Sequence, residues 1–238
     1  MPTRKQPTWN EAASDYGYFI HDTQILFPAL KKLIKSLNVK GKSVIDIACG
    51  TGLSSRLFAE AGCRVTGYDI STEMIQRAAE SKHSKTTTDF QGDARNLPAK
   101  NASADLVSIV TLLSNFSKAV DIQRTFQEAF RILRKSGQLI ICIPHPCSEH
   151  LSFSWARIRR YKKPYRYFEE GLPYRLTLYR EDGESATVTN YHWSIETYLR
   201  LLLEAGFTLE QFLEPRPITQ MKDELRFPVY LMLVARKK

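Results

Sequence analysis

The chain has 238 residues, of which 43% are hydrophobic and 25% are charged, and its formal net charge is +9. Both fractions are ordinary for a globular protein, and the length suits one large domain or one domain with an insertion. No apolar run reaches the roughly 18 residues of a membrane span, and the basic N-terminal residues precede no apolar stretch of the kind found in secretory signals. We therefore expect a cytoplasmic protein without a membrane span.

Cysteine usage agrees with a reducing compartment. The four cysteines are Cys49, Cys63, Cys142 and Cys147, and they form neither a CxxC pair nor a zinc-ligand spacing. Cys63 and Cys142 lie in strand-like runs, where a small buried thiol is the simplest interpretation. We predict no metal site and no disulfide framework.

Residues 9–37 are predicted to form two helices that cap the domain, with Trp9, Tyr16 and Ile20 on one face of the first. From residue 40 onward, strand-like and helix-like patterns alternate. The predicted strands are Lys42–Ala48, Arg64–Asp69, Thr86–Gln91, Ala104–Thr111, Gln138–Pro144, Phe207–Glu214 and Val229–Arg236. The predicted helices between them are Leu53–Ala61, Thr72–Ser81, Val120–Lys135 and Ile195–Ala205.

Capping residues at the helix ends agree with these boundaries. Gly62, Gly137 and Gly206 each stand between a helix and a strand, where glycine commonly ends a helix. Ser71 and Ser194 precede helices, as N-caps do. The alternation predicts an α/β fold, with a mostly parallel sheet and helices on both of its faces.

Two segments depart from the alternation. The last two predicted strands have no helix between them, which predicts an antiparallel hairpin at one edge of the sheet. Residues 146–193 form an insertion after the fifth strand, and its alternating pattern around Asp182-Gly183 predicts a β-hairpin. Because open α/β sheets bind ligands at the carboxyl ends of their strands, we interpret the insertion as a lid over the substrate.

We therefore predict one domain, residues 1–238. Its parts are the N-terminal helical cap (9–37), a cofactor-binding core (40–145), the substrate-lid insertion (146–193) and a C-terminal helix and hairpin (194–238).

The stretch Val44–Gly52, VIDIACGTG, joins a buried strand to a helix through a turn of small residues. Glycines let the backbone approach a ligand closely, and the first N–H groups of the helix point at it. Asp69 ends the second strand and can accept both hydroxyls of a ribose, and Asp93 follows the third and can accept an adenine amino group. Asp46, beside the turn, would repel a pyrophosphate and suits a cationic ligand better. Ser55 stands where a dinucleotide-binding turn has its third glycine.

Together these motifs resemble those of the class I S-adenosylmethionine-dependent methyltransferases. The similar segments are DIACGTG, YDIS, GDARNLP, DLVSIVTLLSNF and AFRILRKSGQLIICIPHP. The resemblance is strong over residues 40–145 and looser over residues 192–238, and it implies a Rossmann-like sheet of seven strands with an antiparallel last strand. Ala48 and Cys49 depart from the commonest form of the first motif, which has glycine and another small residue there. WNEAASDY and YHWSIETYLRLLLEAGF resemble a subgroup that methylates small molecules.

The resemblance implies S-adenosylmethionine as cofactor and S-adenosylhomocysteine as product. The cofactor-binding residues that it implies are Tyr16, Asp46, Ala48, Cys49, Gly50, Gly52, Asp69, Ile70, Met74, Asp93, Ala94, Thr111 and Leu112.

Each of these residues has an implied role. Asp46 would orient the turn and offset the ammonium charge of the cofactor, and the turn glycines would line its methionine part. Asp69 would hold the ribose, and Asp93 with Ala94 the adenine, on which Ile70 and Met74 would pack. Thr111 and Leu112 would face the reacting centre, and Tyr16 would cover the methionine end. Core packing is the alternative for Met74 and Tyr16.

The main catalytic task is to hold a nucleophile in line with the S–CH3 bond and to exclude water. A base is needed where the acceptor must lose a proton, and the candidates are His145, after strand five, and His192, before the helix at Ser194. A hydrogen-bonded structural role is the alternative for both histidines. Residues Thr111–Asn115 lack the Asn-Pro-Pro-Tyr-like run of many amino methyltransferases, which argues against methylation of nucleobase amines.

Charge is concentrated in residues 151–180, which hold eight basic and two acidic residues. We expect transfer of a methyl group to an O, C or N atom of a small molecule, anionic or aromatic, by a monomer or homodimer. One alternative is an RNA methyltransferase that uses the basic segment. Another is an NAD-dependent enzyme or a relative of the fold without catalytic activity.

Overall fold

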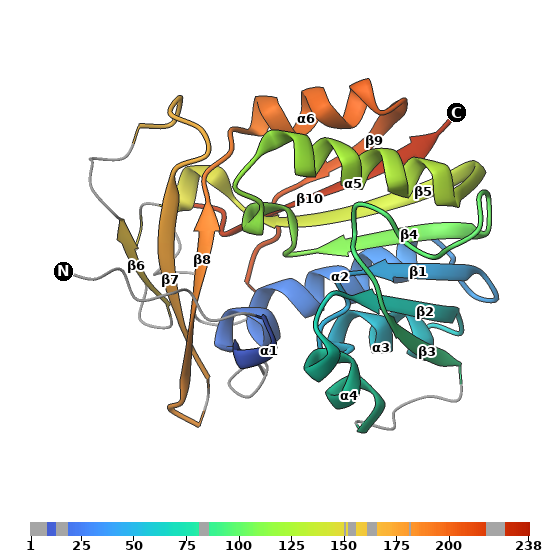
Figure 1. Cartoon of the computed structure of the whole chain (residues 1–238), viewed down its shortest axis with the longest axis horizontal. Helices are drawn as coiled ribbons and strands as arrows, with labels where there is room; N and C mark the ends of the chain where they lie inside the picture. The colour runs from blue at the N-terminus through green and yellow to red at the C-terminus, as the bar shows by residue number, and fades with distance from the viewer. Residues whose placement is uncertain are drawn as a thin grey trace.

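The computed structural model describes residues 9–12, 19–80, 86–149, 151, 156–160, 166–180, 182–217 and 227–238 (Figure 1). For residues 11, 12 and 157–160 it describes the backbone alone. Among the helices of these residues, none is both long and apolar enough to cross a membrane.

Seven strands form one sheet in the order β3-β2-β1-β4-β5-β10-β9. They are β1 (Ser43–Ile47), β2 (Arg64–Asp69), β3 (Thr87–Gln91), β4 (Ala104–Val110), β5 (Leu133–Pro144), β9 (Phe207–Leu213) and β10 (Tyr230–Lys237). Neighbours from β3 to β5 are parallel, whereas β10 runs antiparallel to both β5 and β9. The predicted fold class is confirmed. The chain turns from β1 toward β2 on one side and reaches β4 on the other, so a crevice is expected at the carboxyl ends of β1 and β4.

Helices cover both faces of the sheet (Figure 1). On one face pack α2 (Phe27–Ser36) and α3 (Leu53–Glu60), and on the other α5 (Ala119–Ile132) and α6 (Ile195–Glu204). Alternate residues of the central strands supply the two cores. Val44 and Leu106 face the first layer, whereas Ile45 and Val107 face the second. Burial of both faces explains why these strands read as continuous apolar runs.

The N-terminal helices and the N-cap serines largely match their predicted positions. Residues 9–37 contain α1 (Trp9–Ala12), the π-helical turn η1 (Asp22–Leu26) and α2. Ser71 caps α4 (Thr72–Glu80) by accepting from Met74 N–H at 3.1 Å, and Ser194 caps α6 by accepting from Thr197 N–H at 3.1 Å.

The prediction that Gly137 ends the helix before β5 is wrong. α5 ends at Ile132, and β5 begins at once with Leu133, which pairs with Ala104. The N–H group of Ser103 binds the carbonyl of Ile132 at 2.8 Å, and the helix ends there, three residues before the predicted end at Lys135. Gly137 lies inside the strand, where an added Cβ would lie 2.9 Å from a backbone oxygen.

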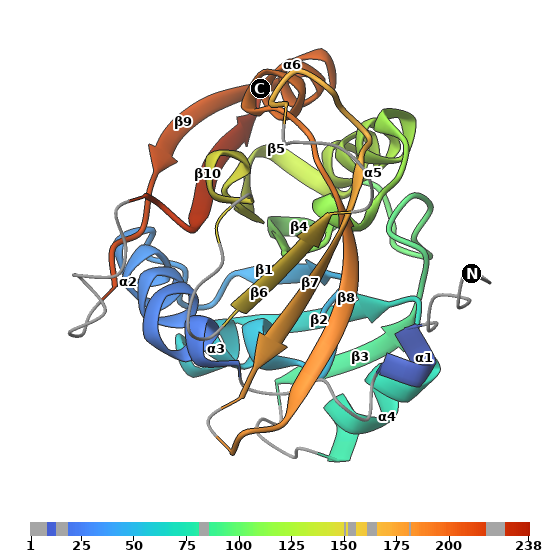
Figure 2. The same cartoon turned by 90° about the vertical axis from the view of Figure 1, so that its left-hand side faces the viewer.

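The insertion forms a separate three-stranded antiparallel sheet, β6-β7-β8. Its strands are β6 (Ala156–Arg160), β7 (Pro173–Tyr179) and β8 (Ser185–Tyr191). The hairpin predicted around Asp182-Gly183 is confirmed as the β7–β8 pair, whereas β6 was not predicted. Figure 2 shows this small sheet standing across the carboxyl ends of the main strands. The short turn η2 (Leu113–Asn115), which follows β4, contacts β8.

The packing around Gly67 in β2 can be tested by substitution. A Cβ added at Gly67 would lie 2.2 Å from Asp89 Oδ1 and 2.8 Å from Cys49 Sγ. We expect Gly67→Ala to lower the free energy of unfolding by about 1–3 kcal/mol through overpacking, measured by urea unfolding. Thr88→Ala on the exposed edge strand serves as control and should stay within about 0.5 kcal/mol of wild type. Equal losses in the two variants would contradict this account.

Candidate active site

A cavity of about 360 Å³ lies at the carboxyl ends of β1, β2 and β4. Small-molecule sites in proteins have volumes of about 300–1,000 Å³. Ten of the residues predicted to bind the cofactor line this cavity: Ala48, Cys49, Gly50, Asp69, Ile70, Met74, Asp93, Ala94, Thr111 and Leu112. Tyr16 lies outside the described residues. The structure thus brings residues from 48 to 112 together in one hollow.

The turn after β1 follows from its small residues. Gly50 and Gly52 take φ angles of 55° and 80°, in the left-handed region that favours glycine. Ala48 also has a positive φ, 57°, which costs about 1 kcal/mol for a residue with a Cβ. No heavy atom lies within 4 Å of a Cβ placed on Gly50, so this residue leaves open space on the cavity side. The turn therefore provides a wall that a ligand can approach at backbone distance.

Asp69 is fixed at the end of β2 by two backbone donors. Gly50 N–H donates to Oδ2 and Ser71 N–H to Oδ1, both at 2.9 Å. Burial raises the pKa of Asp69, and the N–H groups of Ser71 and Gly50 counteract this in part. Each oxygen keeps a lone pair for a further hydrogen bond. A side chain so placed can accept two neighbouring hydroxyls of a ligand in the cavity.

Asp93 is engaged by a residue that the sequence analysis missed. Arg95 donates to both of its carboxylate oxygens, at 2.9 Å from Nε and 2.6 Å from the terminal nitrogen, and also donates to Asp121 at 3.0 Å. These hydrogen bonds lower the pKa of Asp93 and keep it ionised. Arg95 also lies 6.0 Å from the ring centre of Phe116. The arginine leaves Asp93 with only part of its acceptor capacity for a ligand.

Asp46 and Gly52 support the turn from below. The Asp46 side chain is fully buried and accepts hydrogen bonds at 2.7 Å from Ser54, Ser55 and Ser108. These hydrogen bonds join Asp46 to the start of α3 and to β4, and Asp46 does not line the cavity. Its predicted effect on the ammonium charge of the cofactor would therefore act without contact. Gly52 is buried, with Ala78 of α4 3.5 Å from its would-be Cβ.

Thr111 forms the opposite wall, at the end of β4. Its φ is 56°, a left-handed conformation that is unusual for a β-branched residue, and its N–H donates to Cys142 O at 2.8 Å. Strain of this kind is found where surrounding structure fixes a residue at a functional site. Leu112 and the η2 turn continue this wall.

Several lining residues lay beyond sequence reasoning. They are Trp9, Asp22, Leu26, Phe27, Thr51, Leu53, Ser54, Gly92, Arg95, Val110, Asn115, Phe116, Ser117 and Asp121. Some of them adjoin predicted motifs and could have been found by extending these by a few residues. The four from the N-terminal cap carried no signal, because a helical pattern does not say over which strand ends a helix will lie.

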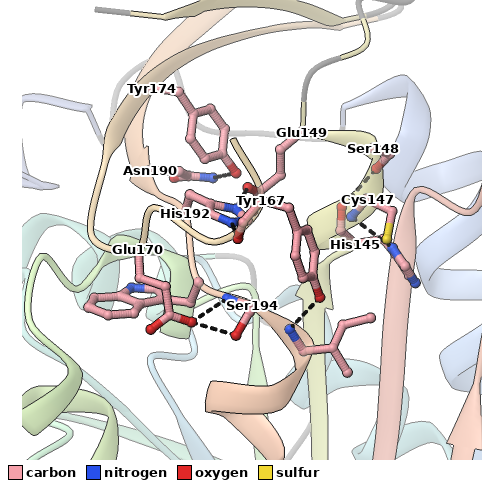
Figure 3. A network of polar contacts seen from close by, with 12 residues as sticks. His145, Cys147, Ser148, Glu149, Tyr167, Glu170, Tyr174, Asn190, His192 and Ser194 are labelled. Carbon is pink, nitrogen blue, oxygen red and sulfur yellow. Dashed lines mark hydrogen bonds and ion pairs between the residues drawn. The ribbon is translucent and has the colours of Figure 1, made fainter. Parts of the chain in front are cut away.

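The structure places His145 outside the cavity, where its contacts agree with the structural alternative. Its side chain is 2% exposed and it does not line the cavity. Nδ1 accepts from Cys147 N–H at 3.2 Å (Figure 3). Nε2 lies 3.2 Å from Glu214 Oε1. Burial lowers the pKa of His145, and Glu214 opposes this only in part. Both ring nitrogens are used to tie the end of β5 to the loop after β9.

His192 also lies outside the cavity lining. Figure 3 shows it between Glu149 Oε2, 2.5 Å from Nδ1, and the carbonyl of Tyr167, 2.8 Å from Nε2. A carbonyl accepts only, so Nε2 carries a proton toward Tyr167. Burial alone lowers the pKa of His192, but the hydrogen bond and negative charge of Glu149 outweigh it and the pKa is raised, which favours the imidazolium form with a second proton on Nδ1. The pair links the lid to the segment after β5.

The two histidines should give opposite pH dependences of stability. Because the pKa of His192 is raised on folding, its contribution is fully present below about pH 6.5 and is lost as pH rises through the folded value. Glu149→Gln breaks a buried pair, and we expect a loss of about 3–5 kcal/mol at pH 5.5 that shrinks by pH 9, measured by urea unfolding.

His145 provides the control. Its pKa is lowered, so its contribution is lost as pH falls below the unfolded value, and His145→Gln should cost more at pH 9 than at pH 5.5. Losses for Glu149→Gln that do not change between the two pH values would contradict a charged His192–Glu149 pair.

Comparison with known proteins agrees with this geometry. A family model described as a methyltransferase domain matches residues 45–141. The demethylmenaquinone methyltransferase of Thermobifida fusca is 36% identical over 105 residues, which are 43% of this chain and 43% of that protein. The chain thus aligns with less than half the length of such curated relatives. An uncharacterised protein of Haemophilus influenzae is 27% identical over 219 residues, 84% of this chain and 83% of that protein.

Solved structures match over more of the chain. An S-adenosylmethionine-dependent methyltransferase from Mesorhizobium loti has a TM-score of 0.68 at 25% identity and covers 89% of this chain and 97% of that one. The strand order, the glycine turn and Asp69 at the end of β2 agree with what the resemblance in the sequence implies. Together the family match over residues 45–141 and the fold support a class I S-adenosylmethionine-dependent methyltransferase, with S-adenosylmethionine as cofactor.

Proposed function

We propose that the chain transfers the methyl group of S-adenosylmethionine to an O, N or C atom of a small-molecule acceptor, by in-line displacement in the cavity at the ends of β1, β2 and β4. The observation that carries this proposal is the Asp69 carboxylate, fixed opposite Gly50 by two backbone N–H groups in a cavity that also holds Thr111. Anchored in this way, the carboxylate is pre-organised to accept the two neighbouring hydroxyls of a ribose.

The residues of the cavity fit the cofactor. Asp69 would hold the ribose hydroxyls, and Gly50, with open space at its Cβ position, would accommodate the methionine part. Ile70 and Met74 provide apolar surface for the adenine, beside Asp93 and Ala94. When bound, the cofactor supplies a methyl carbon made electrophilic by a positively charged sulfur.

The protein's task is then to position and enclose the reactants. Thr111 and Leu112 form the wall at the end of β4, on the side of the cavity away from Asp69 and Asp93. Fixed orientation of two reactants can contribute about 7–11 kcal/mol, and the strained Thr111 backbone holds this wall in one place. The lid strands β6–β8 stand across the same strand ends, where they would exclude water.

The acceptor is proposed to be a small molecule. Curated relatives named demethylmenaquinone methyltransferases align over the cofactor-binding part of this chain, so their similarity supports the donor more than the acceptor. The basic segment does not favour nucleic acid in its described part. Arg166 pairs with Glu169 and Arg180 with Asp182, so two of its cations are already offset by carboxylates.

Calorimetry with S-adenosylhomocysteine tests the donor site. Asp69→Ala removes two hydrogen bonds to a charged group, worth about 1.5–3 kcal/mol each, and should weaken binding at least 100-fold. Asp105→Ala is a matched change at the amino end of β4, away from the cavity, and should leave the affinity unchanged. Thermal melting of each variant checks that it is folded. Unchanged affinity in Asp69→Ala, or equally tight binding of NAD by wild type, would contradict the proposal that this cavity binds the methyl donor.

Turnover is tested with methyl-labelled S-adenosylmethionine and a small-molecule metabolite extract. Wild type should place the label in one or a few products, which mass spectrometry identifies, and Asp69→Ala should label none. Label that appears in added RNA and is suppressed by salt would instead favour the nucleic-acid alternative.

A further inference from the structure

The cavity holds a buried carboxylate that the donor site does not use. Asp22, in η1, is 8% exposed and lines the cavity. Its Oδ1 accepts from the hydroxyl of Tyr230 at 2.9 Å and lies 3.4 Å from Nε2 of His21. Among the described residues, no side chain donates a hydrogen bond to Oδ2. This oxygen can therefore accept a hydrogen bond from a ligand in the cavity.

Asp22 lies on the side of the cavity away from the ribose-binding end. Tyr230 is the first residue of β10, where it pairs with Pro144 at the carboxyl end of β5. Asp22 also raises the pKa of the Cys142 thiol on β5, so it lies near that strand. Asp69 is on β2, four strand spacings or roughly 19 Å from β10. Thr111, whose N–H binds the carbonyl of Cys142, stands between the two carboxylates.

We propose that Asp22 is the group that receives the acceptor's proton, and that the acceptor presents a protic hydroxyl or amino group, not an anion, to this end of the cavity. The inference rests on the proposed function and adds the substrate class to it. A carboxylate repels phosphate and carboxylate acceptors and binds O–H and N–H groups. It therefore narrows the acceptor from anionic or aromatic to a proton donor, aliphatic or aromatic.

The transfer step balances with Asp22 in this role. The acceptor atom loses its proton to Asp22 Oδ2 and keeps the electron pair of that bond. The same atom forms a new bond to the methyl carbon while the S–CH3 bond breaks. The electron pair of the broken S–CH3 bond stays on sulfur, which becomes neutral. The proton then leaves Asp22 for solvent as the product departs.

The surroundings suit a base. Leu26, Phe27 and Val110 line the cavity with Asp22 and provide an apolar environment. Burial raises the pKa of Asp22, while His21 and the Tyr230 hydroxyl counteract this in part. The titratable groups that face it are His21 on its own segment, Tyr230 on β10 and Cys142 on β5. A base with a raised pKa removes a proton more readily, which is why enzymes bury such carboxylates.

Asp22→Asn separates acceptor chemistry from donor binding. We expect this variant to bind S-adenosylhomocysteine within threefold of wild type by calorimetry. In the labelled metabolite-extract assay, its rate should fall about 100-fold or more, the usual contribution of a general base. Glu60→Gln removes an exposed carboxylate on α3 and should change neither value.

Several outcomes would overturn the proposal. A rate within threefold of wild type shows that Asp22 takes no proton. A loss of S-adenosylhomocysteine binding like that of Asp69→Ala assigns Asp22 to the cofactor's ammonium group. If wild type labels nothing in the extract, the proposed function fails, and with it this inference. The labelled product itself distinguishes a hydroxyl from an amino acceptor, and a methylated carboxylate or phosphate would contradict the substrate class.

A second experiment needs no Asp22 variant that folds, and its titration needs no acceptor. In protein with ¹³C-labelled aspartate carboxyls, the Asp22 signal should titrate above its ordinary range, and Tyr230→Phe should raise its pKa further because a hydrogen bond to the carboxylate is lost. The acidic limb of the pH–rate profile should move upward by the same amount. An Asp22 pKa in the ordinary range, or a profile that Tyr230→Phe does not move, overturns the base role.

Discussion

The buried carboxylate of Asp46 is the interaction on which the site depends. It joins three parts of the chain. Asp46 lies on β1, Ser54 and Ser55 are in the first turn of α3, and Ser108 lies on β4. A buried charge is unfavourable without partners, and burial does raise the pKa of Asp46. Three hydroxyl donors at 2.7 Å compensate for the lost solvation. They also fix the start of α3 relative to both strands, so the turn between them has one shape.

That shape positions the next carboxylate. With the turn fixed, Gly50 N–H points at Asp69 Oδ2, and this bond joins β1 to the end of β2. Asp46 thus shapes the cavity through the backbone, whereas Asp69 lines it. This division explains how a carboxylate outside the cavity can still determine the form of a binding turn. It also explains why Ala48 is tolerated in a left-handed conformation, because the surrounding hydrogen bonds hold it there.

Sequence reasoning succeeded where structure and function are set by neighbours along the chain. The alternation of strands and helices, the glycine turn and Asp69 at a strand end depend on periods and spacings of a few residues. It failed where partners are distant in sequence. His192 meets Glu149 43 residues away, and His145 meets Glu214 69 residues away. A histidine beside a predicted crevice looks catalytic until those partners are known. Gly137 failed for the same reason, because the loop at Ser103 ends α5.

The same distinction separates the two halves of the cavity. The donor half is built by consecutive strands and their turns, so its residues form motifs that comparison with other proteins can detect. The acceptor half brings together η1 and β10, and the Tyr230–Asp22 bond spans 208 residues. Such a contact leaves no local pattern, and matches that cover the cofactor-binding segment carry little information about it. The acceptor of such an enzyme is therefore inferred from polar atoms at the far end of the cavity that receive no hydrogen bond from the protein. In the described part of this chain, Oδ2 of Asp22 is such an atom.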